Sequence, residues 1–291
     1  MARIIYVNGR YLPAAEAMIH AEDRGFQFGD AVYEICPVIG GGLVDEAPHL
    51  DRLERSMREL SMQPAMARSA LAHVLKETVR RNRIADGWVY LQVSRGVAPR
   101  DFLFPAPDVA RPGVCLARSQ PLSKGEAQAM QGIAVITTPD IRWDRVDIKS
   151  VQLLAPALAK EKARASGAKE AWLVDGEGFV TEGASSNAWI ITAADDIVSR
   201  SAEHGILRGV TRMVLLDFID RERLRFVKRP FTPGEAAAAK EAFVTSATNF
   251  VMPVVSIDGK AIGGGHPGPF TLRLRGLVVA AAKSQGKSAV V

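Results

Sequence analysis

Runs of β-forming residues alternate with helical runs in the first part of the chain, and this alternation limits the folds open to it. The run IIYVNGRYL at 4–12 predicts two strands joined at Asn8 and Gly9, because these residues accept the positive φ angles of a tight hairpin turn. The run at 31–44 predicts a second strand pair, and HLDRLERSMREL at 49–60 repeats apolar residues at helical spacing. Strands mixed with amphipathic helices in this way predict a two-layer α/β unit.

A polar segment separates this unit from the rest of the chain. SQPLSKGEAQ at 119–128 is rich in turn-forming residues, and a new β-run, GIAVITT, follows at 132–138. A chain of 291 residues is long enough to form two hydrophobic cores. We therefore expect an N-terminal α/β domain at 1–118, an interdomain linker at 119–128 and a C-terminal α/β domain at 129–291.

The composition is that of an ordinary globular protein, with 47% hydrophobic and 24% charged residues. The net charge of +5 is small and the basic residues are scattered, so nucleic acid is not an expected partner. No apolar run approaches the length of a membrane span, and the run at the start is too short for a signal peptide. The cysteines Cys36 and Cys115 form no CxxC motif and are expected to be reduced, which favours a cytoplasmic location.

Several common cofactor and metal motifs are absent or incomplete. The glycines at 263–268 match GxGxxG, but too little chain follows them to complete a βαβ unit. The sequence contains neither a GxxxxGK[ST] phosphate loop nor a GxSxG nucleophile motif. Its five histidines are separated and form no HExxH pair, so no metal site is expected.

One lysine, Lys149, stands at the entrance of the apolar run RVDIKSVQLLAPAL at 145–158. Beside a carboxylate such as Asp147, a lysine is commonly part of a solvated surface pair. Because proline disrupts a regular helix, we expect a helix that begins within a turn of Pro156 or is kinked there, with Lys149 at or just before its start. The residues expected to dock this helix on the sheet are Val151, Leu154, Ala155 and Leu158. A lysine partly removed from water by this docking loses proton affinity, as a nucleophilic amine requires.

A single carboxylate, Glu182, ends the β-run GFVTEG and is followed by the small residues GASSN. Most glutamates at strand ends are exposed to solvent. A carboxylate next to small residues is nevertheless well placed to meet a ligand. Glu182 is therefore a candidate ligand contact.

Three further places are suited to an anion. Gly209 precedes a helical run whose first amides, near Val210 and Thr211, suit a phosphate, although Thr211 also fits a plain helix cap. Thr245–Asn249 ends a β-run in small and hydroxylated residues, which fit either an anion site or an ordinary turn. The helix at 49–60 carries arginines off its apolar face that fit either an anion site or simple solvent exposure. None of these places identifies a ligand by itself.

Seven motifs, in this order, resemble the fold type IV enzymes that use pyridoxal 5'-phosphate, and most closely the D-amino-acid transaminases. They are EDRGFQFGDAVYE, HLDRL, RGVAPR, DIRWDRVDIKS, VTEGASSN, LRGVTR and FVTSAT. The resemblance runs over nearly the whole chain. It implies a two-domain α/β fold (α+β in type) with the active site between the domains, and a homodimer with shared active sites.

The resemblance also implies a role for individual residues. Lys149 in DIKS would hold the cofactor covalently and then move the substrate proton, so that the C-terminal domain carries the reactive lysine. Glu182 in TEG would face the ring nitrogen of the cofactor. The residues implied as a phosphate cradle are Arg52, Val210, Thr211, Ala247 and Thr248.

The resemblance further implies contacts to the substrate carboxylate from Tyr33 and from Arg100, the latter contributed by the partner subunit. The expected activity is ping-pong transfer of the amino group of a D-amino acid, such as D-alanine, to a 2-oxo acid such as 2-oxoglutarate or pyruvate. One position departs from the family pattern, because Phe102 stands where D-amino-acid transaminases typically have histidine. This change affects the expected substrate range.

Two other activities on the same fold stay open. A branched-chain L-amino-acid aminotransferase usually shows Gly-Asn-Tyr soon after the lysine, whereas this chain has SVQLL. An aminodeoxychorismate lyase would release pyruvate without an amino acceptor. A binding protein without enzymatic activity fits less well, because the lysine and the glutamate are both present.

Overall fold

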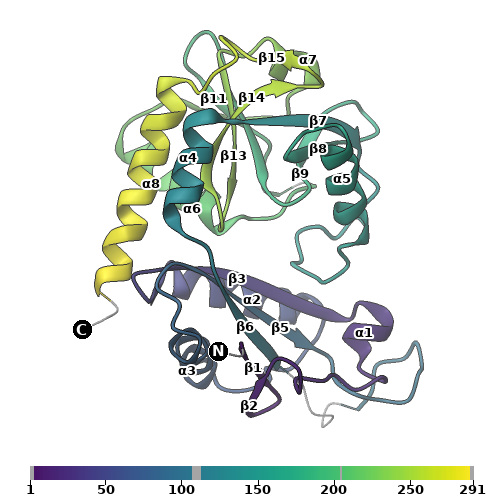
Figure 1. Cartoon of the computed structure of the whole chain (residues 1–291). Helices are drawn as coiled ribbons and strands as arrows, with labels where there is room; N and C mark the ends of the chain where they lie inside the picture. The colour runs from purple at the N-terminus through teal and green to yellow at the C-terminus, as the bar shows by residue number, and fades with distance from the viewer. Residues whose placement is uncertain (1–2, 107–112, 204, 289–291) are drawn as a thin grey trace. The chain divides into compact units, whose positions relative to one another are not determined.

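The computed structural model describes residues 3–106, 113–203 and 205–288. The chain divides into two compact units. Unit 1 comprises Met1–Pro121, Ile148–Gln152 and Ala282–Val291, and unit 2 comprises Leu122–Asp147 and Leu153–Ala281. Figure 1 shows the elements of both units, each of which combines a sheet with helices. The expected α/β fold class is confirmed.

Unit 1 is built on a six-stranded antiparallel sheet with the order β2-β1-β6-β5-β3-β4. Its strands are β1 (Ile4–Val7), β2 (Arg10–Pro13), β3 (Ala31–Ile39), β4 (Gly42–Leu43), β5 (Gly87–Ser94) and β6 (Gly113–Ser119). Its helices are α1 (Arg24–Phe28), α2 (Glu46–Glu59) and α3 (Arg68–Arg81). The hairpin of β1 and β2 turns at Asn8 and Gly9 with φ angles of 48° and 89°, as the sequence predicts.

Helices α2 and α3 cover this sheet, with α2 against β3 and α3 against β1, β5 and β6. The residues Leu50, Leu53 and Met57 recur at helical spacing on α2 and are all buried. Arg52 of the same helix is also buried, at 8% exposure. The arginines of this helix are therefore not all on a solvent-exposed face.

Unit 2 is built on a mixed nine-stranded sheet with the path β12-β11-β10-β13-β14-β7-β8-β9, and β15 pairs with β14. The first strands of the unit are β7 (Ile133–Pro139), β8 (Glu170–Val174), β9 (Val180–Gly183), β10 (Asn187–Ile191) and β11 (Ile197–Ser199). The later strands are β12 (Phe226–Lys228), β13 (Glu241–Ser246), β14 (Phe250–Ile257) and β15 (Lys260–Ala261). The parallel pairs are β14 with β7, β7 with β8, and β11 with β12.

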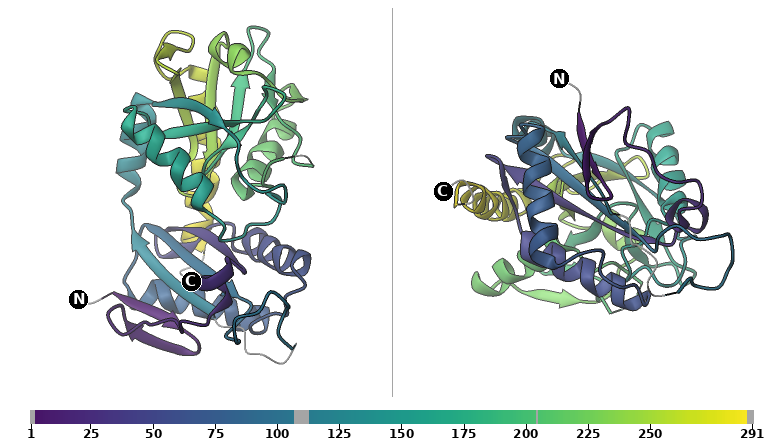
Figure 2. Two further views of the ribbon diagram at one scale, coloured as in Figure 1. Left: turned by 90° about the vertical axis from the view of Figure 1, so that its right-hand side faces the viewer. Right: turned by 90° about the horizontal axis from the view of Figure 1, so that it is seen from below.

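The helices of unit 2 are α4 (Leu122–Gln131), α5 (Leu154–Ala165), α6 (Val210–Arg221), α7 (Pro233–Ala237) and α8 (Pro269–Ser288). The last part of α8, from Ala282 onward, belongs to unit 1. Helix α4 lies beside α8, and α5 lies against β8 (Figures 1 and 2). The core of the sheet contains Trp172, Phe231 and Met252 among other fully buried side chains. In the part of the chain that the structure describes, no helix is long and apolar enough to cross a membrane.

Helix α5 begins at Leu154, within a turn of Pro156 as expected. The prediction of its buried face was wrong, because Leu154 is 75% exposed and Leu158 is 55% exposed. The helix instead packs through Ala159 and Ala163 against a small core. Because alanine side chains are small, this side of α5 can lie close to the strands, and it is therefore the side of the helix that is buried.

The boundaries of the units differ from the expected domains in three places, one of which is the segment Ala282–Val291, expected in the C-terminal domain but assigned to unit 1. Much of the expected linker at 119–128 lies in helix α4 of unit 2. The segment Ile148–Gln152, with Lys149, belongs to unit 1 although we expected it in a C-terminal domain. The physical reason is backbone pairing, since Ser150 forms a β-bridge with Val32 of β3.

Candidate active site

Lys149 lies on an extended segment that the backbone of β3 holds in unit 1. The Tyr33 amide donates to the carbonyl oxygen of Lys149 at 3.0 Å, and the amide of Val151 donates to the carbonyl oxygen of Ala31 at 3.0 Å. The Lys149 amide donates to Ser56 Oγ at 3.2 Å. These bonds fix the main chain on both sides of the lysine. Sheet pairing, rather than the docking of α5, therefore positions Lys149.

The side chain of Lys149 reaches Tyr33, the residue expected at the substrate carboxylate. Its Nζ atom lies 4.2 Å from the centroid of the Tyr33 ring. Tyr33 in turn stacks on Tyr90 at 5.6 Å between ring centroids, and Tyr90 Oη donates to Gln92 Oε1 at 2.6 Å. Burial raises the pKa of Tyr90, so this phenol stays protonated at neutral pH. The structure thus brings together two of the predicted site residues, Lys149 and Tyr33, next to the ring of Tyr90.

Arg52, expected in a phosphate cradle, forms a buried cluster with Glu34 and His49. Arg52 Nε and Nη2 donate to Glu34 Oε1 and Oε2 at 2.7 Å each, and His49 Nδ1 lies 2.7 Å from Glu34 Oε2. Burial acts to raise the pKa of Glu34, but the charge of Arg52 and the hydrogen bonds from Arg52 and His49 together outweigh burial and lower this pKa to about 2. The carboxylate is therefore ionised and holds the guanidinium in one orientation.

Arg100 and Phe102 lie on an exposed segment of unit 1. The guanidinium carbon of Arg100 is 4.6 Å from the centroid of the Phe28 ring, and the Phe102 ring meets Phe28 edge-on at 5.8 Å. Phe102 is 85% exposed. Arg24 Nη1 donates to the carbonyl oxygen of Asp101 at 2.6 Å, which anchors the segment between the two residues. Phe28 thus forms a shared aromatic support for Arg100 and Phe102.

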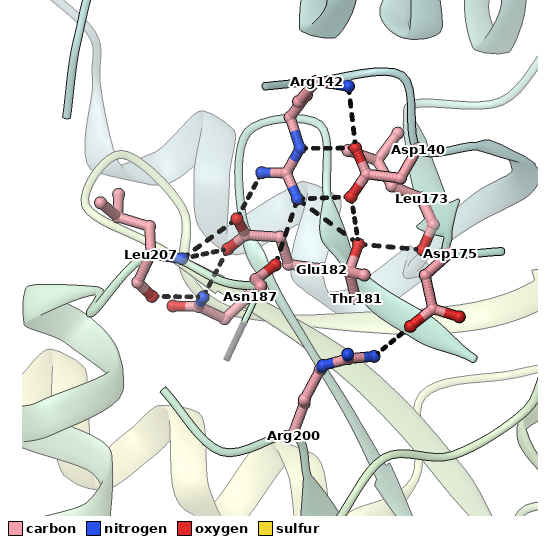
Figure 3. A network of polar contacts seen from close by, with 10 residues as sticks. Asp140, Arg142, Leu173, Asp175, Thr181, Glu182, Asn187, Arg200 and Leu207 are labelled. Atoms are coloured by element: carbon pink, nitrogen blue, oxygen red, sulfur yellow. Dashed lines mark hydrogen bonds and ion pairs between the residues drawn. The ribbon is translucent and has the colours of Figure 1, made fainter. Parts of the chain in front are cut away.

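Glu182 is buried near the end of β9 in unit 2, at 4% exposure, and is surrounded by donors. It accepts hydrogen bonds from Arg142 Nη1 at 2.5 Å, from Asn187 Nδ2 at 2.8 Å, and from the Leu207 amide at 3.1 and 3.2 Å (Figure 3). Burial raises the pKa of Glu182, and the charge of Arg142 opposes that rise. Glu182 is thus buried, unlike most glutamates at strand ends.

Arg142 is shared between Glu182 and a second carboxylate, Asp140 (Figure 3). Its Nε and Nη2 donate to Asp140 Oδ1 and Oδ2 at 2.9 and 2.7 Å. Thr181 Oγ1 donates to Asp140 Oδ2 at 2.8 Å. Although Asp140 is partly buried, these bonds lower its pKa, so both carboxylates face a fixed guanidinium.

Asn187 connects Glu182 to the start of α6. Besides its bond to Glu182, its Nδ2 donates to the carbonyl oxygen of Leu207 at 3.0 Å. Its Oδ1 lies so close to Gly209 that a Cβ built on Gly209 would clash with it. The glycine therefore lets α6 begin in contact with Asn187. This places the first residues of α6, Val210 and Thr211, in the same part of unit 2 as Glu182.

The N-terminus of α6 has the features of an anion site. Its N-cap residue is Gly209, and no capping side chain bonds to it in the described part of the chain. The first amides of this helix thus lack the usual side-chain acceptor, and the helix dipole favours a negative charge there. Val210 and Thr211 are 2% and 6% exposed. This arrangement favours the anion interpretation over the cap in which Thr211 is the capping residue.

The turn between β13 and β14 carries Ala247 and Thr248. Strand β13 pairs with β10, and its Thr245 lies opposite Asn187, so the turn follows the strand end next to the start of α6. Ser246 Oγ is buried and has no hydrogen-bond partner among the described residues. A buried hydroxyl without a partner is uncommon and fits a ligand bound at this strand end.

Arg275 of α8 fixes the far side of this turn. Its Nη1 donates to the carbonyl oxygens of Asn249 and Val251 at 2.7 and 2.6 Å. The residue between them, Phe250, has a φ of 57°, which is strained for an aromatic residue. Burial lowers the pKa of Arg275, which is 8% exposed. The bonds from Arg275 therefore support a strained backbone next to the expected phosphate cradle.

Sequence reasoning missed several of these residues. Arg142 and Asn187 lie inside the quoted motifs DIRWDRVDIKS and VTEGASSN, but nothing in their spacing pointed to Glu182 as their partner. Arg275 lies in the closing helix without a motif. Glu34 lies one residue after Tyr33, and the alternation of strand side chains could have suggested that it faces the helix layer with Arg52.

Comparison with known proteins gives a family. Residues 31–257 match the model of the family described as amino-transferase class IV. The chain is 39% identical over 270 residues to the D-alanine aminotransferase of Bacillus licheniformis, covering 92% of this chain and 93% of that protein. It is 37% identical over 271 residues to the D-alanine aminotransferase of Staphylococcus haemolyticus, covering 93% and 95%.

Solved structures share the fold. The T.th. branched-chain amino acid aminotransferase with pyridoxamine 5'-phosphate superposes with a TM-score of 0.90 at 26% identity, covering 99% of this chain and 98% of that one. An aminotransferase of Mycobacterium tuberculosis in a PLP-bound form gives a TM-score of 0.83 at 21% identity, with 97% and 99% covered, and shows the fold alone. The expected fold type IV is confirmed, and the chain belongs to the class IV aminotransferase family.

Proposed function

We propose that this protein is a pyridoxal 5'-phosphate-dependent aminotransferase that moves the amino group of a D-amino acid, such as D-alanine, to a 2-oxo acid. The observation that carries the proposal is the position of the buried Glu182 carboxylate. It bonds to Asn187, which in turn lies against Gly209 at the uncapped start of α6. The identity of 35–39% to D-alanine aminotransferases over most of the chain supports the substrate class. A branched-chain activity is less well supported, because it rests on fold neighbours of lower identity.

The residues of unit 2 fit the cofactor. A carboxylate held by four hydrogen bonds suits a protonated ring nitrogen, and the α6 amides with the unpartnered Ser246 hydroxyl suit a phosphate. In unit 1, Arg52 is fixed by Glu34 and supplies a guanidinium of the kind that binds phosphate. We assign the phosphate contacts to Arg52, Val210, Thr211, Ala247 and Thr248.

We assign to Lys149 covalent attachment of the cofactor and transfer of the substrate proton. Its main chain is held by hydrogen bonds to Tyr33 and Ser56, while its amino group stays at the end of a flexible side chain. A fixed main chain with a mobile amine allows the same group to bind and to carry a proton over a short distance. Positioned acid-base groups of this kind contribute typically about 10²–10⁴-fold to a rate.

Glu182 has the role of holding positive charge at the ring nitrogen. Pyridoxal 5'-phosphate, when bound, supplies a ring that takes up the charge left after the substrate Cα–H bond breaks. Glu182 supports that role only if its carboxylate is ionised and directed at the nitrogen. The bonds from Asn187, Leu207 and Arg142 supply the direction.

Tyr33 and Arg100 are assigned to the substrate carboxylate. The Tyr33 ring lies 4.2 Å from Lys149 Nζ, so a substrate that reaches the lysine also meets the tyrosine. Arg100 shares its aromatic support with Phe102, an apolar ring where a polar histidine is typical of the resembling enzymes. We therefore propose a substrate pocket that tolerates larger apolar groups near the carboxylate.

We further propose a homodimer in which Arg100 acts in the active site of the partner. Unit 1 exposes the large apolar side chains Phe26, Phe102, Leu103 and Phe104. Exposed apolar groups gathered in this number are typical of a protein interface. A mixture of K149A and R100A chains tests the idea, since only a heterodimer with exchanged arginines contains one intact site. Recovered activity supports it, whereas activity no higher than that of the separate variants contradicts it.

We also propose a cytoplasmic location for the enzyme. The sequence supports it, because Cys36 and Cys115 form no CxxC motif and are expected to be reduced, and reduced cysteines persist in a reducing compartment. Fractionation of cells producing the native chain tests the location.

The reaction is tested by half-reactions with paired D- and L-amino acids, followed by the absorbance of the bound cofactor. We expect the enzyme to react with D-alanine but not with L-alanine, and we expect the Lys149→Ala variant to react with neither. Borohydride reduction followed by peptide mass spectrometry should place the cofactor on Lys149. Preferential turnover of L-leucine or L-valine would establish the branched-chain activity instead.

A further inference from the structure

The polar cluster around Glu182 contains two carboxylates and one guanidinium in direct contact. Arg142 donates to Asp140 through Nε and Nη2 and to Glu182 through Nη1 (Figure 3). With both acids ionised, these three groups carry a net charge of minus one. The cluster is therefore able to take up one further positive charge.

Another arginine of this region is directed elsewhere. Arg212 is 3% exposed, but its Nη1 donates to Ser199 Oγ at 2.6 Å and its Nη2 to the carbonyl oxygen of Arg200 at 2.8 Å. Its guanidinium carbon lies 4.5 Å from the centroid of the Trp189 ring. Arg200 binds Asp175 at 2.6 Å instead of Glu182. Among these three arginines, direct contact with the Glu182 carboxylate comes from Arg142.

Arg142 is itself held rigidly. It lies 11% exposed, and the Asp140 carboxylate grips two of its nitrogens side by side, a geometry that fixes the plane of the guanidinium. Thr181 Oγ1, one residue before Glu182 on β9, donates to Asp140 and accepts from Arg142 Nη2 at 3.4 Å. Asp140 thus sets the orientation of the guanidinium, and Thr181 of the strand that carries Glu182 bonds to both Asp140 and Arg142.

We propose that Arg142, held by Asp140 and Thr181, is a positioning residue that keeps the Glu182 carboxylate ionised and directed at the ring nitrogen of the cofactor. The proposal rests on the proposed function, which assigns the ring nitrogen to Glu182. Without Arg142, a carboxylate so deeply buried would gain a proton or turn toward other donors. The bonds from Asn187 and Leu207 are neutral and do not replace a charge.

The test compares two ligands of the cofactor-free enzyme that differ at one ring atom. The first is pyridoxine 5'-phosphate, which has no aldehyde and so cannot attach to Lys149. The second is its analogue with CH in place of the ring nitrogen, which cannot bind Glu182 through that position. Dissociation constants are measured by equilibrium dialysis or by tryptophan fluorescence.

In Arg142→Gln we expect pyridoxine 5'-phosphate to bind about 10- to 100-fold more weakly, the range for loss of a hydrogen bond to a charged group, while the analogue binds nearly as before. Arg142→Lys should recover part of the affinity for the first ligand, because it restores the charge without the fork geometry. Arg200→Gln is the matched control. It removes a guanidinium paired with a carboxylate of the same unit and should alter neither constant.

An equal loss for both ligands in Arg142→Gln would overturn the proposal, because it would mean a general structural effect. If Arg142→Gln does not fold, the Arg142→Lys variant is used instead. An equal loss of affinity for both ligands in Arg142→Lys would also contradict the proposal. Glu182→Leu, which offers no polar atom to the ring nitrogen, separates this failure from a failure of the proposed function. If Glu182→Leu keeps the preference for pyridoxine 5'-phosphate over the analogue, Glu182 is not the partner of the ring nitrogen.

Discussion

Glu34 and Arg52 form a bidentate ion pair in the interior of unit 1, with both nitrogen to oxygen distances at 2.7 Å. Their side chains are 1% and 8% exposed. His49 completes the cluster by contacting the same carboxylate. Because α2 supplies both Arg52 and His49 while β3 supplies Glu34, this pair couples the packing of a helix on a sheet to the orientation of a predicted phosphate ligand.

Replacement of Glu34 by glutamine should destabilise the protein strongly. The change leaves the buried guanidinium of Arg52 without its counter-charge, a loss of about 3–5 kcal/mol for a pair of this kind. Glu77→Gln is the control, since Glu77 binds the exposed Arg80 and Arg81 and should contribute no more than about 1 kcal/mol. Urea denaturation measures both. Similar losses in the two variants would contradict the assignment.

The stability of the protein should fall as the pH drops below about 6.5. Burial lowers the pKa of His49 from 6.5, so the unfolded chain binds a proton that the folded chain does not, and protonation favours unfolding. Glu34, with a pKa of about 2 compared with 4.5, contributes stability above pH 4.5 that is lost as the pH falls toward 2. Thermal unfolding between pH 5 and 8 should show the first step, and His49→Asn should flatten it.

Gly209→Ala should weaken cofactor binding although the backbone there is unstrained, with a φ of −61°. The added Cβ would clash with Asn187 Oδ1, and Asn187 is held by Glu182 and Leu207. We expect a loss of about 1–3 kcal/mol in stability from overpacking, and weaker binding of pyridoxine 5'-phosphate.

Gly276→Ala is the control for this change. A Cβ at Gly276 meets no atom within 4 Å, and the site lies within helix α8. The substitution should leave ligand binding unchanged and stabilise the helix by about 0.5–1 kcal/mol. Unchanged binding in Gly209→Ala as well would show that the start of α6 does not contact the ligand.

Arg275→Met should loosen the turn that carries Ala247 and Thr248. It removes the donors to the carbonyl oxygens of Asn249 and Val251, which costs roughly 1–3 kcal/mol for buried acceptors left unsatisfied. Binding of pyridoxine 5'-phosphate should weaken. Arg273→Met is the control, because Arg273 is 56% exposed and pairs with Glu222 at the surface. Denaturation curves and dialysis report the two effects, and equal behaviour of both variants would rule out a role for Arg275.

The sequence predicted the element types well where local rules apply. The Asn8-Gly9 hairpin, helix α2 and the start of α5 near Pro156 follow from turn chemistry, apolar spacing and the geometry of proline. The buried face of α5 was not predictable from Leu154 and Leu158, because it depended on how closely alanines can approach the strands. Helix α4, which overlaps the expected linker, was missed for lack of an apolar period.

The sequence by itself determined the family, the α/β fold class and the identity of Lys149 and Glu182 as candidates, because these follow from collinear motifs and residue chemistry. Only the tertiary structure decided which groups act on them. Backbone pairing with β3 holds Lys149 beside Tyr33, and Arg142, distant from Glu182 along the chain, supplies its counter-charge. Tyr33 and Arg142 reach these residues through sheet pairing and burial, which the spacing of residues along the sequence does not specify.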